Sequence, residues 1–377
     1  MQEKMTKTQK RTKTGRRIAA IIIAMVVAFV VLMTGCGGDD AQQTATQTQN
    51  SENVATRVFT DDCGRQIEIP EKVTTVIASG SLAQITIFAI APETLIAING
   101  AWSDDAAKYV DSKYLELPEV GSFFGNHDLN YEEIAKLSPQ IVLDVGEAKP
   151  DMKSNLEDIT TKTGIPAIHI DAYYDSMDSA FEKMGDLFGK EEEAKALADF
   201  CRDTLTESKE TLEKVDKKTT VMYCTQEDGL NVLAKDSYHS QIVDYLSDNV
   251  AVLEDPSSQG SGNEVNLEQM MIWNPEVIIF APGSYYDYVA DDPAWQSLKA
   301  IKKGNYYEVP SGPYNWMGSP PSSNRILGML WMAKLLYPKE AGFDLKEKTI
   351  EYYDLFYHHD LSDEEYEKLV SNSILKK

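Results

Sequence analysis

One phrase occurs twice in this chain, and it limits the possible folds more than any other feature. Residues 130–143 read NYEEIAKLSPQIVL, and residues 266–279 read NLEQMMIWNPEVII. Each copy begins with Asn, places Glu two residues later, and continues with apolar residues at helical spacing, a Pro and an aliphatic run. Two such copies predict two similar lobes, because a solenoid of short repeats needs three or more of them.

Each copy predicts a short helix, a turn and a buried strand. Asn130 and Asn266 are expected to cap the two helices, and the following Glu lies in the first turn, where the helix dipole favours an anion. Pro139 and Pro275 end the helices, since proline cannot continue the backbone hydrogen bonds. The aliphatic runs that follow are typical of strands buried on both faces.

The rest of the chain alternates strands and helices in the same way. This alternation predicts an α/β fold with parallel sheets. An almost uninterrupted helical pattern over 176–215 separates the two lobes. The expected strands are 73–78, 94–99, 141–145 and 167–171 before this helix, and 219–224, 250–253, 277–280 and 306–309 after it.

The start of the chain has the pattern of a secretory signal. Residues 1–17 hold seven basic residues and one Glu, residues 18–32 are almost wholly apolar, and Met33-Thr34-Gly35-Cys36 follows. A Cys directly after small residues resembles the lipobox of bacterial lipoproteins, so we expect residues 1–35 to be removed and Cys36 to carry lipid. An uncleaved membrane anchor is the alternative. Both interpretations place the protein outside the cytoplasmic membrane, with residues 36–55 as a polar, flexible tether.

Charge and cysteine content exclude several classes of function. Removal of the signal leaves 29 basic against 59 acidic residues, a net charge of −30, which argues against binding to nucleic acid or to an anionic membrane surface. Cys63, Cys201 and Cys224 show no CxxC spacing, so neither a cysteine metal cluster nor a disulfide framework is indicated. No hydrolase or phosphate-loop motif is present, and we expect no enzymatic activity and no cofactor.

Several segments in order resemble the substrate-binding proteins of ABC importers for cobalamin, ferric siderophores and haem. They are VFTDDCGR at 58–65, the two copies of the repeated phrase, KGNYYEV at 303–309 and PPSSNR at 320–325. The resemblance implies two Rossmann-like lobes joined by a single long rigid helix, with the ligand between the lobes. The corresponding division is an N-terminal lobe at 56–174, an interlobe helix at 175–216, a C-terminal lobe at 217–310, and a return segment with C-terminal helices at 311–377.

The resemblance also gives the repeated phrase a purpose. In this family each lobe presents one surface Glu to one subunit of a dimeric permease, and the matching positions are Glu132 and Glu268. A two-fold symmetric partner requires the same contact twice. The alternative is that each carboxylate only interacts with the positive end of its own helix dipole. The expected partners are therefore the permease dimer and a small ligand, with the binding protein itself a monomer.

The ligand is expected at the carboxyl ends of the parallel strands, where α/β lobes bind their ligands. Aromatic side chains among small residues at these positions suit a bulky ligand. The residues selected in this way are Ser79, Ser81, Trp102, Phe123, Phe124, His127 and Glu147 from the N-terminal lobe, and Tyr223, Gln226, Tyr285, Tyr314 and Trp316 from the remainder.

Ligand identity stays open at the level of sequence. His127 lies in a glycine-flanked loop and could ligate a metal in the cargo, and His239 has a weaker claim, but both could equally be ordinary hydrogen-bonding residues. We predict no resident metal. A ferric siderophore, haem or a corrinoid is expected, a small oxyanion such as molybdate is the alternative, and a tethered sensor without transport is a further one.

Overall fold

The repeated phrase forms the same structural unit in both lobes. The computed structural model describes residues 55–100, 102–123 and 128–376. Helices α3 (Tyr131–Leu137) and α8 (Leu267–Trp273) each begin at an Asn whose side chain accepts a hydrogen bond from the backbone N–H three residues on, at 3.0 Å and 2.8 Å. Both end in a left-handed residue, Ser138 and Asn274, before the Pro. The predicted capped helix, turn and strand are therefore confirmed.

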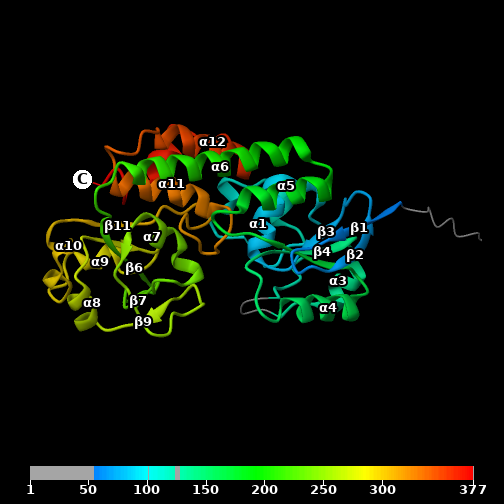
Figure 1. Cartoon of the computed structure of the whole chain (residues 1–377), viewed down its shortest axis with the longest axis horizontal. Coiled ribbons are helices and arrows are strands. Elements are labelled where there is room, and N and C mark those ends of the chain that lie inside the picture. The colour runs from blue at the N-terminus through cyan, green and yellow to red at the C-terminus, as the bar shows by residue number, and fades with distance from the viewer. Residues whose placement is uncertain (1–54, 101, 124–127, 377) are drawn as a thin grey trace, which may run out of the picture. The chain divides into compact units, whose positions relative to one another are not determined.

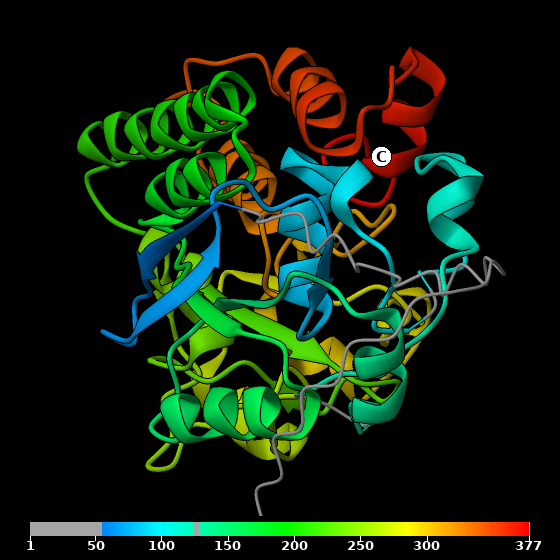
Figure 2. The ribbon, with the colours of Figure 1, turned by 90° about the vertical axis from the view of Figure 1, so that its right-hand side faces the viewer.

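The N-terminal lobe is built on a parallel three-stranded sheet, in the order β3 (Val76–Ala78), β4 (Ile141–Gly146) and β5 (Ala167–Asp171). Alternate residues face opposite layers: Leu143 packs with α1 (Ser81–Ile90) and α5 (Met177–Phe188), whereas Val142 packs with α3 and α4 (Met152–Thr163). Figure 2 shows α4 on one side of this sheet and the pair of α5 and α6 (Glu191–Glu213) on the other. The prediction of a strand at 94–99 is wrong, because that segment forms only isolated β-bridges at Leu95 and Ile98.

The C-terminal lobe contains a six-stranded sheet in the order β11-β10-β6-β7-β9, with β8 also paired to β6. Strands β6, β8, β10 and β11 run parallel, but β7 is antiparallel to both of its neighbours, β6 and β9, so the sheet is mixed rather than parallel as predicted. The strand expected at 250–253 is displaced to Asp248–Asn249, and Val252 is largely exposed. The bounds are β6 Thr220–Thr225, β7 Asn231–Val232, β8 Asp248–Asn249, β9 Asn263–Glu264, β10 Val277–Phe280 and β11 Tyr306–Glu308.

The prediction of one continuous helix over 175–216 is wrong, because two helices occupy that stretch. Helix α5 (Met177–Phe188) ends at Gly189, which adopts the left-handed conformation at φ 62°, and α6 (Glu191–Glu213) begins after one further residue. The two helices pack closely: a Cβ on Gly185 would lie 2.4 Å from the Cβ of Ala194. Helix α6 alone leads to β6 of the second sheet (Figure 1).

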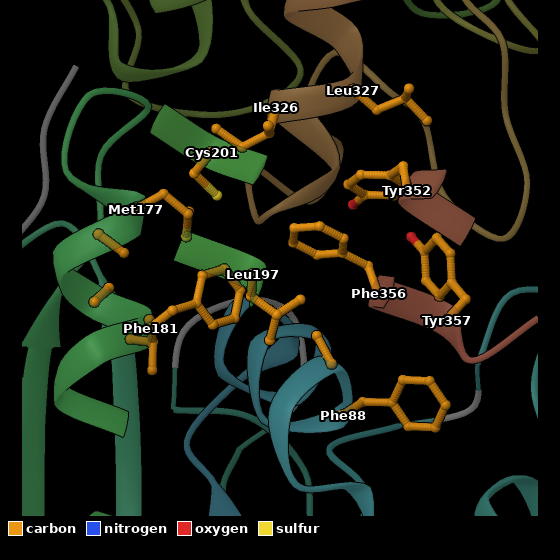
Figure 3. Close-up of a cluster of buried hydrophobic side chains, with 14 of the residues drawn as sticks. Phe88, Met177, Phe181, Leu197, Cys201, Ile326, Leu327, Tyr352, Phe356 and Tyr357 are labelled. Atoms are coloured by element: carbon orange, nitrogen blue, oxygen red, sulfur yellow. The ribbon is translucent and has the colours of Figure 1, made fainter. Parts of the chain in front are cut away.

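The C-terminal helices complete a shared core. Helices α11 (Asn324–Leu336) and α12 (Leu345–Tyr357) pack against α6 and α1 (Figure 1). Figure 3 shows Phe356 of α12 between Tyr352 of the same helix and Phe181 of α5, near Leu197 of α6. The remaining elements are β1 Thr56–Thr60, β2 Gln66–Pro70, α2 Ser112–Leu115, α7 Gln241–Leu246, α9 Tyr286–Val289, α10 Lys299–Lys302, α13 Asp363–Leu369, and short 3-10 turns at Pro92–Thr94, Ala106–Lys108, Tyr238–Ser240 and Trp295–Ser297.

Several predictions concern residues outside the described ranges: the signal at 1–35, Cys36 with nearly all of the tether, and the two ligand candidates Phe124 and His127. Among the helices of the described residues, none has the length and apolarity needed to cross a membrane. Both sheets fall within the lobes predicted at 56–174 and 217–310, although the boundaries themselves stay a prediction. Cys201 and Cys224 are buried in α6 and β6, and all three described cysteines are free.

Candidate ligand cleft

Two adjoining cavities open at the carboxyl ends of the strands, and together they form the cleft. The inner cavity has a volume of about 390 Å³ and lies mainly between the ends of β6, β10 and β11 and the return segment. The interlobe cavity, of about 460 Å³, lies between the end of β4 and the C-terminal lobe. His239 and Gly260 line both cavities and therefore mark their junction.

Both lobes contribute walls to the cleft. The inner cavity is lined by Ser103, Tyr223, Thr225, Gln226, Glu227, Leu233, His239, Gly260, Ala281, Pro282, Gly283, Ser284, Ser311, Pro313, Tyr314, Asn315, Met317, Gly318 and Ser319. The interlobe cavity is lined by Leu82, Asp144, Val145, Gly146, Glu147 and Lys149 from the N-terminal lobe, and by Tyr238, His239, Ser258, Gln259, Gly260, Pro320 and Pro321. This placement agrees with the rule that α/β lobes bind ligands beyond their strand ends.

His239 is a neutral imidazole at the junction of the cavities. Burial lowers its pKa below the usual 6.5, the nearby Arg325 guanidinium lowers it further, and backbone carbonyls only partly oppose this. A Cβ on Gly260 would lie 3.2 Å from Cε1 of His239, so the bare glycine leaves space beside the ring. A ligand that spans both cavities would therefore pass this imidazole without meeting a fixed positive charge.

A buried polar network supports the N-terminal wall. Asp144 lines the interlobe cavity, accepts a hydrogen bond from the Ser79 hydroxyl, and lies 2.6 Å from Nδ1 of the fully buried His169. The other ring nitrogen lies 2.9 Å from Asp171. Burial lowers the pKa of His169, but the hydrogen bonds and charges of the two carboxylates outweigh it, and the net direction is upward. The network fixes the Asp144 carboxylate at the edge of the cleft.

The lobes are held together beside the cleft by Tyr238 and Arg325. The Tyr238 hydroxyl donates to the carbonyl of Ala172 in the N-terminal lobe at 3.1 Å and accepts from Arg325 Nη2 at 3.0 Å. The buried guanidinium also stacks over the Tyr238 ring, 4.6 Å from its centroid. Tyr174 and Tyr245 form a further ring contact between the lobes at 5.5 Å. These contacts fix the width of the interlobe cavity in this structure.

Four of the residues selected from the sequence line the cleft. Tyr223, Gln226 and Tyr314 line the inner cavity, and Glu147 lines the interlobe cavity. Tyr223 is held in place by a hydrogen bond from Asn315 Nδ2 at 3.0 Å. Gln226 follows the end of β6 in a left-handed conformation with φ 62°. The structure therefore places these four predicted residues in the lining of the cleft.

Six other predicted residues lie elsewhere. Ser79 lies beneath Asp144, Ser81 is an exposed residue at the start of α1, and half-buried Phe123 packs in the N-terminal lobe. Tyr285 stacks on Trp295 within its own lobe at 5.6 Å. Their positions in the chain were compatible with the cleft, but local packing directs the side chains away from its lining.

The two tryptophans expected in the cleft are core residues instead. Trp102 contacts the Phe88 ring at 5.2 Å and donates its ring N–H to the carbonyl of Tyr114 at 3.1 Å. Trp316 is only 1 % exposed. Neither lines the inner or the interlobe cavity. The expectation that both face the interlobe space is therefore wrong: burying an indole in the core removes a large apolar area from water.

Sequence reasoning overlooked important parts of the lining. Asp144 interrupts the aliphatic run of β4, and a lone acid in a buried strand is a signal that could have been used. Tyr238 and Ser103 carried no comparable signal, because a short 3-10 turn and a loop hold them at positions that depend on tertiary contacts. Within the described residues, no group of three or more His, Cys, Asp and Glu side chains is arranged to hold a metal ion.

Glu132 and Glu268 are both exposed, at equivalent positions of α3 and α8. Their surroundings differ one turn further along each helix. Lys136 of α3 forms an ion pair with Glu133 at 3.1 Å, whereas the corresponding Ile272 of α8 is 76 % exposed. Both helices thus place an exposed carboxylate at the same position, but beside an ion pair in α3 and beside an exposed apolar side chain in α8.

Comparisons with known proteins agree with this architecture. The sequence model of the family described as periplasmic binding protein matches residues 77–313. The molybdate-binding protein MolA of Haemophilus influenzae is 24 % identical over 81 % of this chain and 92 % of its own length, and the Fe(3+)-citrate-binding protein YfmC of Bacillus subtilis is 23 % identical over 79 % and 91 %. A solved ABC transporter solute binding protein from Sulfurospirillum deleyianum superposes with a TM-score of 0.77, at 28 % identity, over 83 % of this chain and 98 % of its own.

Proposed function

Because the chain belongs to the periplasmic binding protein family, whose members are solute-binding proteins of ABC importers and not enzymes, we propose that it captures a metal chelate and delivers it to a permease. The observation that carries the proposal is the cleft, whose two cavities join at His239 and Gly260 between walls from both lobes. The sequence supports lipid attachment at Cys36, which would hold the protein on the outer side of the cytoplasmic membrane.

The charges of the cleft favour a ligand of low net charge. Asp144, Glu147 and Glu227 contribute carboxylates, Lys149 is the one lysine among the described lining residues, and no arginine lines either cavity. A strongly anionic ligand would face more negative than positive groups, and like charges across an interface are costly. The polar tyrosine, serine, threonine and amide groups suit the periphery of a bulky chelate. An uncharged or cationic iron complex or a corrinoid is therefore the preferred cargo.

A small oxyanion is the second candidate, because a relative that covers most of the chain is named for molybdate. Against it stand the size of the cleft and the absence of arginine from the described lining. A compact dianion requires several convergent donors of hydrogen bonds or positive charge. The two candidates thus differ in a way that a direct binding assay separates.

Delivery is proposed to use the repeated helices. Exposed Glu132 and Glu268 occupy the same position in each lobe and would each contact one permease subunit. An exposed charge at the rim of an interface mainly sets the docking position and the association rate. The Asn caps and proline-terminated turns hold both helices in the same local geometry, so the two contacts would be equivalent.

A screen of the purified mature protein tests the proposal. Native mass spectrometry and thermal unfolding would be measured with ferric siderophores, haemin, cyanocobalamin, ferric citrate and molybdate. A cargo present at 1,000 times its dissociation constant should raise the free energy of unfolding by about 4 kcal/mol. We expect one chelate to bind with one-to-one stoichiometry. Binding of molybdate alone would select the second candidate, and failure of every metal complex to bind would contradict the proposed cargo class.

A further inference from the structure

The C-terminal extension, residues 340–376, reaches the wall of the inner cavity, although it lies beyond the residues matched by the family. The Tyr353 hydroxyl of α12 donates a hydrogen bond to the carbonyl of Gly312. Tyr353 itself is fully buried. Gly312 is followed by Pro313, Tyr314 and Asn315, all of which line the inner cavity. One hydroxyl of the extension is therefore bonded directly to a cavity-lining segment.

Gly312 has no room to move away from this contact. Its φ of 157° lies in a region that favours glycine, and an added Cβ would lie 2.9 Å from Tyr109 Oη and 3.0 Å from Leu369 Cδ2. Tyr109 belongs to the N-terminal lobe and Leu369 to α13 of the extension. Gly312 thus lies between Tyr109 of the N-terminal lobe and Leu369 of the extension.

A second contact leads from the tail of the extension to another wall. Asn372 Nδ2 donates to Glu308 Oε2 at 2.7 Å, and the N–H of Glu308 donates to the carbonyl of Asn372 at 3.1 Å. The other carboxylate oxygen of Glu308 accepts from the N–H of Gly283 at 3.4 Å. Gly283 lies in the loop 281–284, all four residues of which line the inner cavity. Asn372 therefore orients the carboxylate that holds this loop.

The elements that carry Tyr353 and Asn372 are both packed against the rest of the protein. Phe356 of α12 packs on Phe181 of α5, with ring centroids 5.6 Å apart (Figure 3). His358 Nε2 lies 3.2 Å from the carbonyl of Phe88 in α1. At the tail, the indole N–H of Trp331 donates to Ser373 at 3.1 Å. Because α12 is anchored in the shared core, Tyr353 can hold the segment 311–315 instead of moving with it.

We propose that the C-terminal extension positions the inner cavity for its ligand, with Tyr353 holding the segment 311–315 and Asn372 holding the loop 281–284. Neither residue lines the cavity, so both are positioning residues. The inference rests on the proposed function in one respect, namely that the inner cavity receives the cargo. The positioning itself is a property of the ligand-free protein and can be measured without any cargo.

Amide hydrogen exchange of the ligand-free mature protein tests the proposal with three variants. Tyr353→Phe removes only the hydroxyl that reaches Gly312, and Asn372→Ala removes the amide that reaches Glu308. Tyr352→Phe is the matched control, because its hydroxyl, on the same helix, makes no hydrogen bond to the segment 311–315 or to the loop 281–284. The reporters are the amides of Gly312 and Trp316 for one wall and of Gly283 and Ser284 for the other.

Loss of one hydrogen bond should speed local exchange about fivefold, which corresponds to about 1 kcal/mol. We expect Tyr353→Phe to accelerate Gly312 and Trp316 but not Gly283, Asn372→Ala to do the reverse, and Tyr352→Phe to accelerate neither wall. A purely structural role would lower the unfolding midpoint and leave the exchange at both walls at the native rate, or accelerate the two walls equally. Either of these results overturns the proposal.

A separate arm distinguishes this inference from the proposed function. Cyanocobalamin and haemin are titrated into the native protein and into each variant, well below the unfolding midpoint, where loss of global stability alone does not change affinity. A probe that binds the native protein should bind Tyr353→Phe and Asn372→Ala about threefold to tenfold more weakly, and Tyr352→Phe equally well. Failure of both probes to bind the native protein counts against the cargo class, whereas the exchange pattern decides the positioning.

Discussion

The buried network beneath the cleft gives a prediction whose magnitude follows from burial. His169 lies between two carboxylates: Asp144, with 7 % of its side chain exposed, and Asp171, with 38 % exposed. Replacing one member of a buried charge pair costs about 3–5 kcal/mol, because the remaining charge stays without compensation. A half-exposed pair contributes only about 0.2–1 kcal/mol. Asp144→Asn should therefore destabilise the protein about 3 kcal/mol more than Asp171→Asn, although both bond the same imidazole.

The pH dependence of this difference has a defined sign. The folded-state pKa of His169 is raised above its usual 6.5, so the protonated imidazole stabilises the fold fully below pH 6.5. That contribution is lost as the pH rises through the folded-state pKa. The gap in unfolding free energy between the native protein and Asp144→Asn should accordingly be larger near pH 6 than near pH 9. Because both proteins share the remaining titratable groups, taking the difference between them cancels the pH dependence that those groups contribute.

Urea unfolding, followed by circular dichroism at the two pH values, measures all of these quantities. The unfolding curves of the native protein, Asp144→Asn and Asp171→Asn are fitted with one common slope of free energy against urea concentration. Equal destabilisation by the two substitutions would refute the argument from burial. A gap that widens as the pH rises would refute the assignment of a raised pKa to His169.

Three further predictions follow from the account. Charge reversal of Glu132 or Glu268 should leave cargo affinity unchanged and lower transport, with a larger effect when both are reversed, because the two carboxylates lie on helices of different lobes and would contact different subunits; native transport by the double variant would refute the docking role. Trp316→Ala should lower the free energy of unfolding by about 3–5 kcal/mol, as loss of a buried indole does, and a native unfolding midpoint would contradict its place in the core. Cys36→Ala should abolish labelling by a fatty-acid analogue, and continued labelling would exclude lipid attachment at this cysteine.

The features that could be predicted from sequence were those decided locally. Asn130 and Asn266 cap their helices because the capping bond joins residues only three apart. The aliphatic strands at 141–145, 167–171 and 277–280 were recognisable because both of their faces are buried. The carboxyl ends of these strands then indicated the position of the cleft, which Glu147, Tyr223, Gln226 and Tyr314 line.

The features that could not be predicted depend on contacts between distant segments. Gly189 divides the interlobe stretch into two helices, but a single glycine within a helical pattern gives no firm signal of a break. The two-residue strands β7 and β9 depend on pairing with a distant or neighbouring strand, β7 with β6 and β9 with β7. Trp102 and Trp316 follow expected cleft segments, yet the choice between core and cleft for each ring depends on Phe88 and on the C-terminal helices, which the local sequence does not reveal.

The central claim is that the cargo occupies the cleft where its two cavities meet. Gly260→Leu tests it most directly, because even a Cβ there would lie 3.2 Å from His239 and the longer side chain would fill the junction. Gly342→Leu is the control, since that exposed glycine has no atom within 4 Å of an added Cβ. The measurement is calorimetric titration of the chelate that the screen identifies. We predict native affinity in Gly342→Leu and loss of binding in a folded Gly260→Leu; native affinity in Gly260→Leu would contradict the account.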